Sequence, residues 1–273
     1  MKVIFSRKGF DGTAGGCPSP IVDGRPVSLP IPTRMPTPTR YGDLTGAYAD
    51  LVSDLTKGRH AAESYCHLDP DITPSSLPRL PGWRGSLGQT SASQSHLSNQ
   101  GIETGDLFLF WGLFRNVRHD GRWRFVGERE HRIWGWLRIG EIIDLGTDGS
   151  HALRSRPWLR DHPHVRPGWS AQNALYIASD ELVLDDRVLQ LPGTGVLQNG
   201  HRLTIPGGLT STWRVPEWLN PALGGSGMTY HPLARWSADG SVRSAARGQE
   251  FVAAPKPDSG AVEWIAALLR EAA

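Results

Sequence analysis

The chain has 273 residues, enough for one large domain or two small ones, and it is 38% hydrophobic with 11 tryptophans, enough to bury a core. Its net charge is only +2, and lysine supplies just four of its 29 basic residues. The other basic residues are arginines, which can contact a phosphate or a base with two hydrogen bonds. We expect no membrane span and no secretory signal, and two cysteines without a pairing motif favour a reduced, cytoplasmic protein.

The first 20 residues combine a short apolar run with a polar, glycine-rich segment. Residues 3–5 predict a strand, and the residues that follow are Ser6, Arg7, Lys8, Asp11 and glycines at 12, 15 and 16. A strand that ends in such a loop often delivers side chains to a site, because glycines let backbone N–H groups approach an anion. The spacing matches neither the P-loop nor the dinucleotide fingerprint, and a tight turn with solvated charges is the alternative.

The next 80 residues alternate between loops and one expected helix. Prolines exclude helix over residues 23–40, whereas apolar residues at helical spacing predict a helix over 41–57. Residues 68–82 are again rich in proline. Residues 82–100 are rich in Gly, Ser and Gln and too long for a mere connector, which predicts a binding loop around His96.

The region from residue 101 onward predicts a curled sheet. Residues 107–111 and 123–126 read as strands on either side of a hairpin tip at 116–121, and glycines in the long strand 132–143 suggest a bend or bulge. Further segments are expected as strands (174–178, 202–205 and 248–253), a short helix (213–219) and an amphipathic C-terminal helix (262–271).

These elements predict an α+β fold on a mostly antiparallel twisted sheet or a partly open barrel, with long N-terminal loops and a C-terminal helix. No internal repeat and no clean linker divides the chain, so we expect a single domain over residues 1–273. In that domain, a loop-rich part (1–100) packs on a β-rich core (101–255), and the C-terminal helix covers 260–272.

Two extended segments carry potential metal ligands at alternate positions. Alternation puts His67 and Asp69 on one side of the chain, and likewise His162 and His164. Imidazole with carboxylate suits Fe, Zn or Mn, so these four residues are the predicted ligands of a divalent transition metal. Ordinary turns without metal are the alternative. The sequence has no HExxH, no GxSxG and no cysteine nucleophile constellation.

Residues 86–96 are dense in amides and hydroxyls. Gln89 could pair with an adenine-like edge, and Trp83 lies nearby for stacking, which suggests a pocket for a flipped base. A flexible polar loop is the alternative.

Several motifs together resemble a known family. Ser6-Arg-Lys-Gly-Phe-Asp, His67-Leu-Asp-Pro-Asp and Arg247-Gly-Gln-Glu-Phe-Val are similar to the third class of nucleotide-modification-associated domains, and the resemblance covers nearly the whole chain. The family takes its name from its neighbourhood to phage and bacterial genes for DNA-base hypermodification, which implies a role near modified nucleotides without supplying a reaction. Separately, residues 105–110 and 135–143 resemble the central strands of PUA-like barrels (ASCH and EVE relatives), which read RNA or modified bases.

The favoured hypothesis is a protein that recognises and modifies a nucleobase or nucleotide, with a free nucleotide or DNA carrying a modified or flipped base as its partner. One alternative is a metal-dependent enzyme, with non-haem iron or zinc, that acts on a small molecule or peptide. Another is a non-catalytic PUA-like reader of modified DNA. The expected catalytic residues are Asp11, His67, Asp69 and His96, and the expected substrate-binding residues are Ser6, Arg7, Lys8, Gln89, Arg247 and Gln249.

Overall fold

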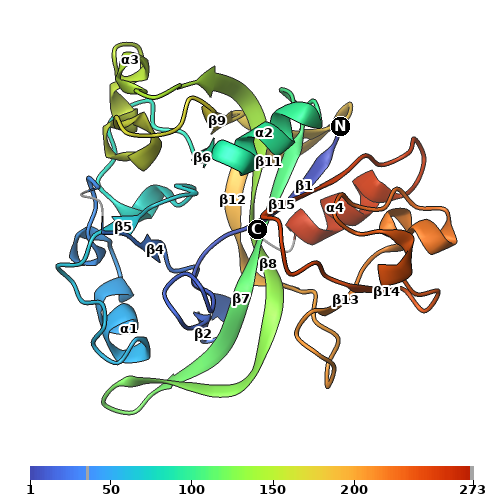
Figure 1. Ribbon diagram of the computed structural model, residues 1–273, viewed down its shortest axis with the longest axis horizontal. Coiled ribbons are helices and arrows are strands. Elements are labelled where there is room, and N and C mark those ends of the chain that lie inside the picture. The colour runs from blue at the N-terminus through green and yellow to red at the C-terminus, as the bar shows by residue number, and fades with distance from the viewer. Residues whose placement is uncertain (35–36, 271–273) are drawn as a thin grey trace.

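A computed structural model describes residues 1–34 and 37–270 of the chain. Its centre is a nine-stranded mixed sheet with the order β15-β1-β7-β8-β9-β6, to which β12 adds beside β8, β2 adds beside β7 and β3 adds beside β2 (Figure 1). The strands of this sheet are β1 (Val3–Arg7), β2 (Ser19–Val22), β3 (Arg25–Pro26), β6 (Ser86–Thr90), β7 (Leu107–His119), β8 (Trp123–Asp144), β9 (Asn173–Ala178), β12 (Thr194–Arg202) and β15 (Glu250–Ala253).

The long hairpin β7–β8 forms the backbone of the sheet. The first five residues of β7, Leu107 to Trp111, are all buried because both faces of this part of the strand are covered. β1 and β2 run parallel to β7, whereas the other pairings in this sheet are antiparallel. The prediction of an α+β fold on a mostly antiparallel sheet is therefore confirmed, and within residues 1–34 and 37–270 the sheet is open and forms no closed barrel.

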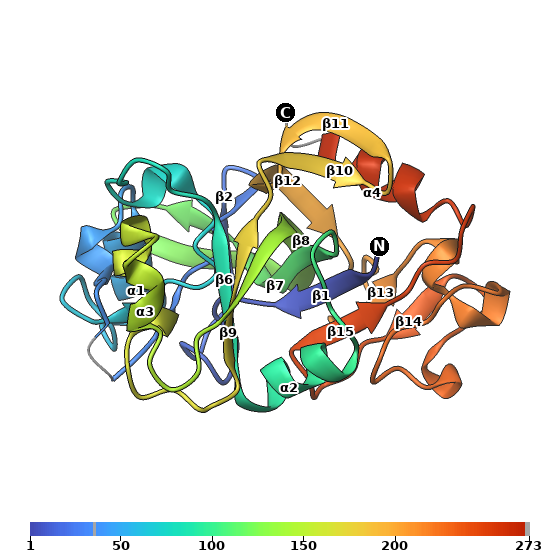
Figure 2. The same cartoon turned by 90° about the horizontal axis from the view of Figure 1, so that it is seen from above.

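Helices and short strands surround this sheet. The N-terminal segments with α1, β4 and β5 lie on one side of the β7–β8 hairpin, and α4, β13 and β14 lie on the other (Figures 1 and 2). The helices are α1 (Tyr48–Leu55), α2 (Ser91–Asn99), α3 (Ser150–Leu153) and α4 (Ala261–Arg270). The remaining strands are β4 (Ile31–Pro32), β5 (Cys66–His67), β10 (Glu181–Leu184), β11 (Arg187–Pro192), β13 (Thr212–Arg214) and β14 (Ser241–Arg243).

Short 3-10 helices make up much of the rest of the connecting segments. They cover Tyr41–Asp43, Pro74–Ser76, Pro157–Asp161, Pro163–Val165, Glu217–Leu219, Pro221–Leu223 and Leu233–Arg235. Within the part of the chain that the structure describes, no helix is both long and apolar enough to cross a membrane.

Three hydrophobic clusters account for most of the core. One packs α4 and the C-terminal segments against one face of the sheet, and a second fills the opposite face around Phe108, Phe110 and Tyr176. A third joins α1 to the N-terminal loops around Phe10 and Tyr41. The loops that lead to His67 are therefore anchored by their own buried side chains, which fixes their position relative to the sheet.

Some local expectations were wrong. Much of the segment 82–100 is not a loop: Ser86–Thr90 pairs with Asn173–Ala178 as the last strand of the sheet, and helix α2 follows directly. Pairing with a partner distant in sequence overrides the low strand propensity of this segment.

Three further boundaries differ from the expected ones. The helix expected over 41–57 is reduced to Tyr48–Leu55, because Gly46 has φ +100° and interrupts it. The segment 213–219 divides into strand β13 and the short turn Glu217–Leu219, and β7 and β8 extend the hairpin so that its tip is 120–122. Pro36, which was among the prolines taken to exclude helix, and residues 271–272 of the expected C-terminal helix lie outside the described residues.

Candidate metal centre

Two separate segments bring histidines to Asp69. His67 ends the short strand β5, where it pairs with Ile31 of β4, and Asp69 follows two residues later. His164 lies in the 3-10 helix Pro163–Val165, and His162 caps that helix by accepting a hydrogen bond from the backbone N–H of His164 at 3.3 Å. The proline at the first helical position fixes the turn that orients both imidazoles.

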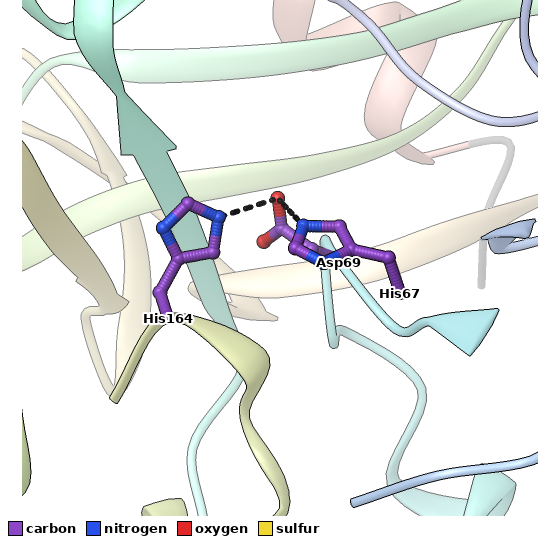
Figure 3. A group of neighbouring side chains, drawn as sticks. All are labelled: His67, Asp69 and His164. Atoms are coloured by element: carbon purple, nitrogen blue, oxygen red, sulfur yellow. Dashed lines mark ion pairs between the residues drawn. The ribbon is translucent and has the colours of Figure 1, made fainter. Parts of the chain in front are cut away.

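The side chains of His67, Asp69 and His164 converge on one point. One ligand atom from each lies within 4.8 Å of the others, so the three residues could hold a metal ion. Both imidazoles approach the same carboxylate oxygen from different sides (Figure 3). The Nε2 atoms of His67 and His164 lie 3.8 Å and 3.9 Å from Oδ2 of Asp69.

Hydrogen bonds fix the tautomer of His164. The Nδ2 of Asn173 donates to the carbonyl oxygens of Gly146 and His164, both at 3.1 Å, so its Oδ1 is the acceptor. The Nδ1 of His164, 2.7 Å from that oxygen, must carry the hydrogen. Its Nε2 therefore presents a lone pair toward Asp69, which is the arrangement that second-shell partners impose on metal-binding histidines. The ring also stacks on Trp169 at 4.2 Å.

The two oxygens of Asp69 have different surroundings. Oδ1 accepts a hydrogen bond from the backbone N–H of Gly88 at 2.7 Å and lies 3.5 Å from Nε2 of His162, whereas Oδ2 faces His67, His164 and Lys8. Burial favours a higher pKa for Asp69, but the charge of Lys8 and the interaction with His162 outweigh it and hold that pKa well below its usual range. The carboxylate is therefore ionised, as a metal ligand must be.

Gly88 lets this cluster pack closely. A Cβ at this position would lie 2.2 Å from Cγ of His164, which is closer than any side chain allows. Glycine is thus the residue that permits both the backbone hydrogen bond to Asp69 and the position of the His164 ring.

Burial keeps the two imidazoles uncharged. It lowers the pKa of His67 to about 4 and that of His164 to about 3, although the carboxylate of Asp69 opposes both shifts. Both rings are neutral at pH 7, and neutral imidazole is the form that binds metals.

A second buried carboxylate lies beside the first. Glu250, at the start of β15, accepts hydrogen bonds on Oε1 from Ser6 Oγ at 3.0 Å and from Nε2 of Gln89, while its Oε2 is buried without a partner in the described part of the chain. Burial raises the pKa of Glu250, and Lys8 opposes that rise. The Nζ of Lys8 lies 3.8 Å from Oε1 of Glu250 and 3.8 Å from Oδ2 of Asp69, so this one cation serves two carboxylates.

Lys8 and the three residues of the candidate metal centre, His67, Asp69 and His164, line a cavity of about 350 Å³. The N-terminal segment supplies another wall, where Oδ1 of Asp11 accepts hydrogen bonds from the backbone of Thr13 and Ala14 and its Oδ2 lies 3.9 Å from Nε of Arg7. The predicted site residues that line the cavity are Arg7, Lys8, Asp11, His67, Asp69, Gln89, His164 and Gln249.

The other predicted residues lie outside the cavity lining. Ser6 is buried against Glu250, and His162 lies behind Asp69. His96 is on α2, where its Nε2 lies 3.1 Å from Oγ1 of Thr229, and Arg247 is exposed; neither is among the described residues that line the cavity.

Glu250 and Asn173 were not among the expected site residues. Glu250 directly follows Gln249, which was an expected binding residue. Because neighbouring side chains on a strand point to opposite faces, one of these two residues must point inward. Asn173 has no local signal, because its role depends on contact with His164 and Gly146.

The fold and the site define an α+β protein with a candidate metal centre made of two histidines and an aspartate. The family described as nucleotide modification associated domain 3 matches residues 2–254, so the chain belongs to that family and the resemblance stated above is confirmed. No curated protein and no solved structure gives a significant match to the chain.

Proposed function

We propose that this protein is a metal-dependent enzyme that binds a nucleotide in the 350 Å³ cavity and modifies it. The observation that carries the proposal is the convergence of two neutral imidazoles and one ionised carboxylate at a cavity, in a chain from a family associated with nucleotide modification. Two histidines with one carboxylate leave coordination positions for substrate or water, which is typical of catalytic rather than purely structural sites.

The donor set fits a first-row transition metal such as Fe, Zn or Mn. The tautomer of His164 is already the one that a metal requires, and the second oxygen of Asp69 is held by the backbone N–H of Gly88. When bound, the metal would act as a Lewis acid and lower the pKa of a coordinated water. The positive charge of Lys8 beside such an ion is balanced by Glu250 as well as Asp69.

The remaining residues of the cavity suit a nucleotide. Gln89 gives its Nε2 hydrogen to Glu250, which leaves its amide oxygen for a donor on a base edge. Trp169, already stacked on His164, adds aromatic surface to the same cavity. Asp11 orders the glycine-rich segment and holds Arg7 at its edge, so we assign it a positioning role.

Metal content tests this proposal. Protein purified without chelator should contain close to one transition metal per chain by elemental analysis. His164→Ala should weaken metal binding by more than about 100-fold, because losing even an outer partner of a metal ligand costs about 10–100-fold. His96→Ala is the matched control and should keep its metal.

The second arm of the experiment tests modification. Metal-loaded protein is incubated with the four deoxynucleoside monophosphates and with single-stranded DNA, and the nucleosides are then analysed by mass spectrometry. A mass change that His164→Ala abolishes supports the proposal. A protein that is purified without any metal, and that binds modified DNA without changing the mass of its nucleosides, would instead be a reader of modified DNA.

A further inference from the structure

A second cavity shares Arg7 with the metal cavity. Its volume is about 570 Å³, and it lies between the end of β1, the start of β7 and the segment 232–246. Arg7 lines both cavities. Alternation along β1 explains this position: Ser6 and Lys8 turn toward Glu250, whereas Arg7 leaves the opposite face of the strand.

The lining of this second cavity is strongly basic. It contains the guanidinium groups of Arg7, Arg235 and Arg243 and, among the described residues, no carboxylate. Arg235 donates hydrogen bonds to the carbonyl oxygens of Arg243 and Ser244 at 3.2 Å and 3.4 Å, which holds the segment that carries Arg243. Arg7 also lies 3.9 Å from a carboxylate oxygen of Asp11, but three arginines around one hollow still attract an anion, and their planar forks match phosphate oxygens.

Neutral hydrogen-bond donors complete the lining. Nδ1 of His131 accepts a hydrogen bond from Nε1 of Trp213 at 2.9 Å, so the neutral ring carries its hydrogen on Nε2. Nε1 of Trp111 and Oγ of Ser244 are both buried without a hydrogen-bond partner in the described part of the chain, although both residues line this cavity. Unpaired buried polar groups are costly, which favours a ligand that satisfies them.

From these contacts we propose that the second cavity binds a phosphate group of the substrate, held by Arg7, Arg235 and Arg243, while the part to be modified enters the metal cavity on the other side of Arg7. This inference rests on the proposed function and sharpens it: the substrate is a phosphorylated nucleoside and not a free base. The proposal also gives Arg7 and Lys8 different roles. Lys8 lies between the carboxylates of Asp69 and Glu250 and is not available to a phosphate.

Calorimetric titration of the full chain, freed of metal with a chelator, tests the phosphate site. The probes are the four deoxynucleoside 5′-monophosphates, the matching nucleosides, and a short single-stranded oligonucleotide without a terminal phosphate. A monophosphate should bind at least about tenfold more tightly than its nucleoside, since a charge-assisted contact contributes that much or more. If the oligonucleotide binds and the monophosphates do not, the phosphate belongs to a nucleic acid strand.

Matched variants assign the site. Arg243→Gln should lower the affinity for the phosphate probe about tenfold, whereas Arg118→Gln, which changes an exposed arginine on the β7–β8 hairpin, should leave it unchanged. The proposal is overturned if nucleosides bind as tightly as monophosphates, if no phosphate compound binds, or if the two variants behave alike. His164→Ala should still bind phosphate, so failure of the metal hypothesis and failure of the phosphate site give different results.

Discussion

Asp69 and Glu250 are two buried carboxylates that share one lysine, yet their proton affinities shift in opposite directions. Their side chains are 4% and 1% exposed, and both lie 3.8 Å from Nζ of Lys8. Burial raises the pKa of both groups, but for Asp69 Lys8 and His162 reverse the shift, whereas for Glu250 the rise remains.

The distribution of donors explains the difference. Asp69 accepts a hydrogen bond from the backbone N–H of Gly88 on one oxygen, which also lies near His162, and Lys8 lies near the other oxygen. Glu250 receives both of its hydrogen bonds on Oε1 and leaves Oε2 buried and unpaired. Depth of burial alone therefore does not set the pKa of a carboxylate, because neighbouring charges and the hydrogen bonds on each oxygen also act on it.

Removing the shared cation should have the largest effect. Lys8→Met leaves two buried carboxylates without their common partner, and we expect the free energy of unfolding of the metal-free protein to fall by about 3–5 kcal/mol. Urea denaturation measures this loss, with the exposed Lys57→Met as control. Added Zn²⁺ should restore more stability to Lys8→Met than to the wild type, because the ion replaces the missing charge. Equal stability of the two lysine variants would contradict the shared role of Lys8.

Neutralising each carboxylate separately sharpens the comparison. Asp69→Asn removes an ionised group whose partners include Lys8, and should cost about 3 kcal/mol in the metal-free protein. Glu250→Gln should cost less than about 1 kcal/mol, because Gln keeps an oxygen for Ser6 and Gln89 and Lys8 keeps Asp69 as a partner. The same denaturation experiment compares both variants, and a larger loss for Glu250→Gln would contradict the greater importance of Asp69.

The pH dependence of stability should show a smaller effect from the histidines beside Asp69. Their folded pKa values, about 4 for His67 and about 3 for His164, lie below the ordinary value of 6.5. As the pH falls through 6.5 the unfolded chain takes up protons first, so stability that is fully present above pH 6.5 is lost toward pH 4, at about 1.4 kcal/mol per pH unit for each histidine.

Denaturation of metal-free protein at several pH values measures this slope. His164→Asn lacks one of these titrations and should have a slope smaller by about 1.4 kcal/mol per pH unit. Glu250 acts with the opposite sign, since its raised pKa contributes stability at low pH that is lost as the pH rises through its folded value. An unchanged slope in His164→Asn would show that this ring does not stay neutral in the folded chain.

Much of the fold follows from local patterns. The apolar run at Leu107–Trp111, the glycine-broken strand after Arg132 and the amphipathic C-terminal helix all formed as expected, because each signal lies within one segment. The polar segment 86–100 was misread, because β6 is stabilised by pairing with β9, nearly 90 residues further along the chain. Such pairing leaves no periodic signal in the segment itself.

The sequence by itself determined the ligand types, since His67, Asp69, His162 and His164 were all expected as metal ligands, although His164 lies in a 3-10 helix and not in the expected extended segment. Only the tertiary structure decided which of them meet: His164 joins His67 and Asp69, while His162 caps a turn and contacts the far oxygen of Asp69. Tertiary packing also decided that Glu250 lies beside Lys8, and that Arg7 lines a second cavity as well as the one that it shares with Lys8. Residue type fixes what a side chain can bind, but charge, tautomer and partners depend on contacts between segments that are far apart in sequence.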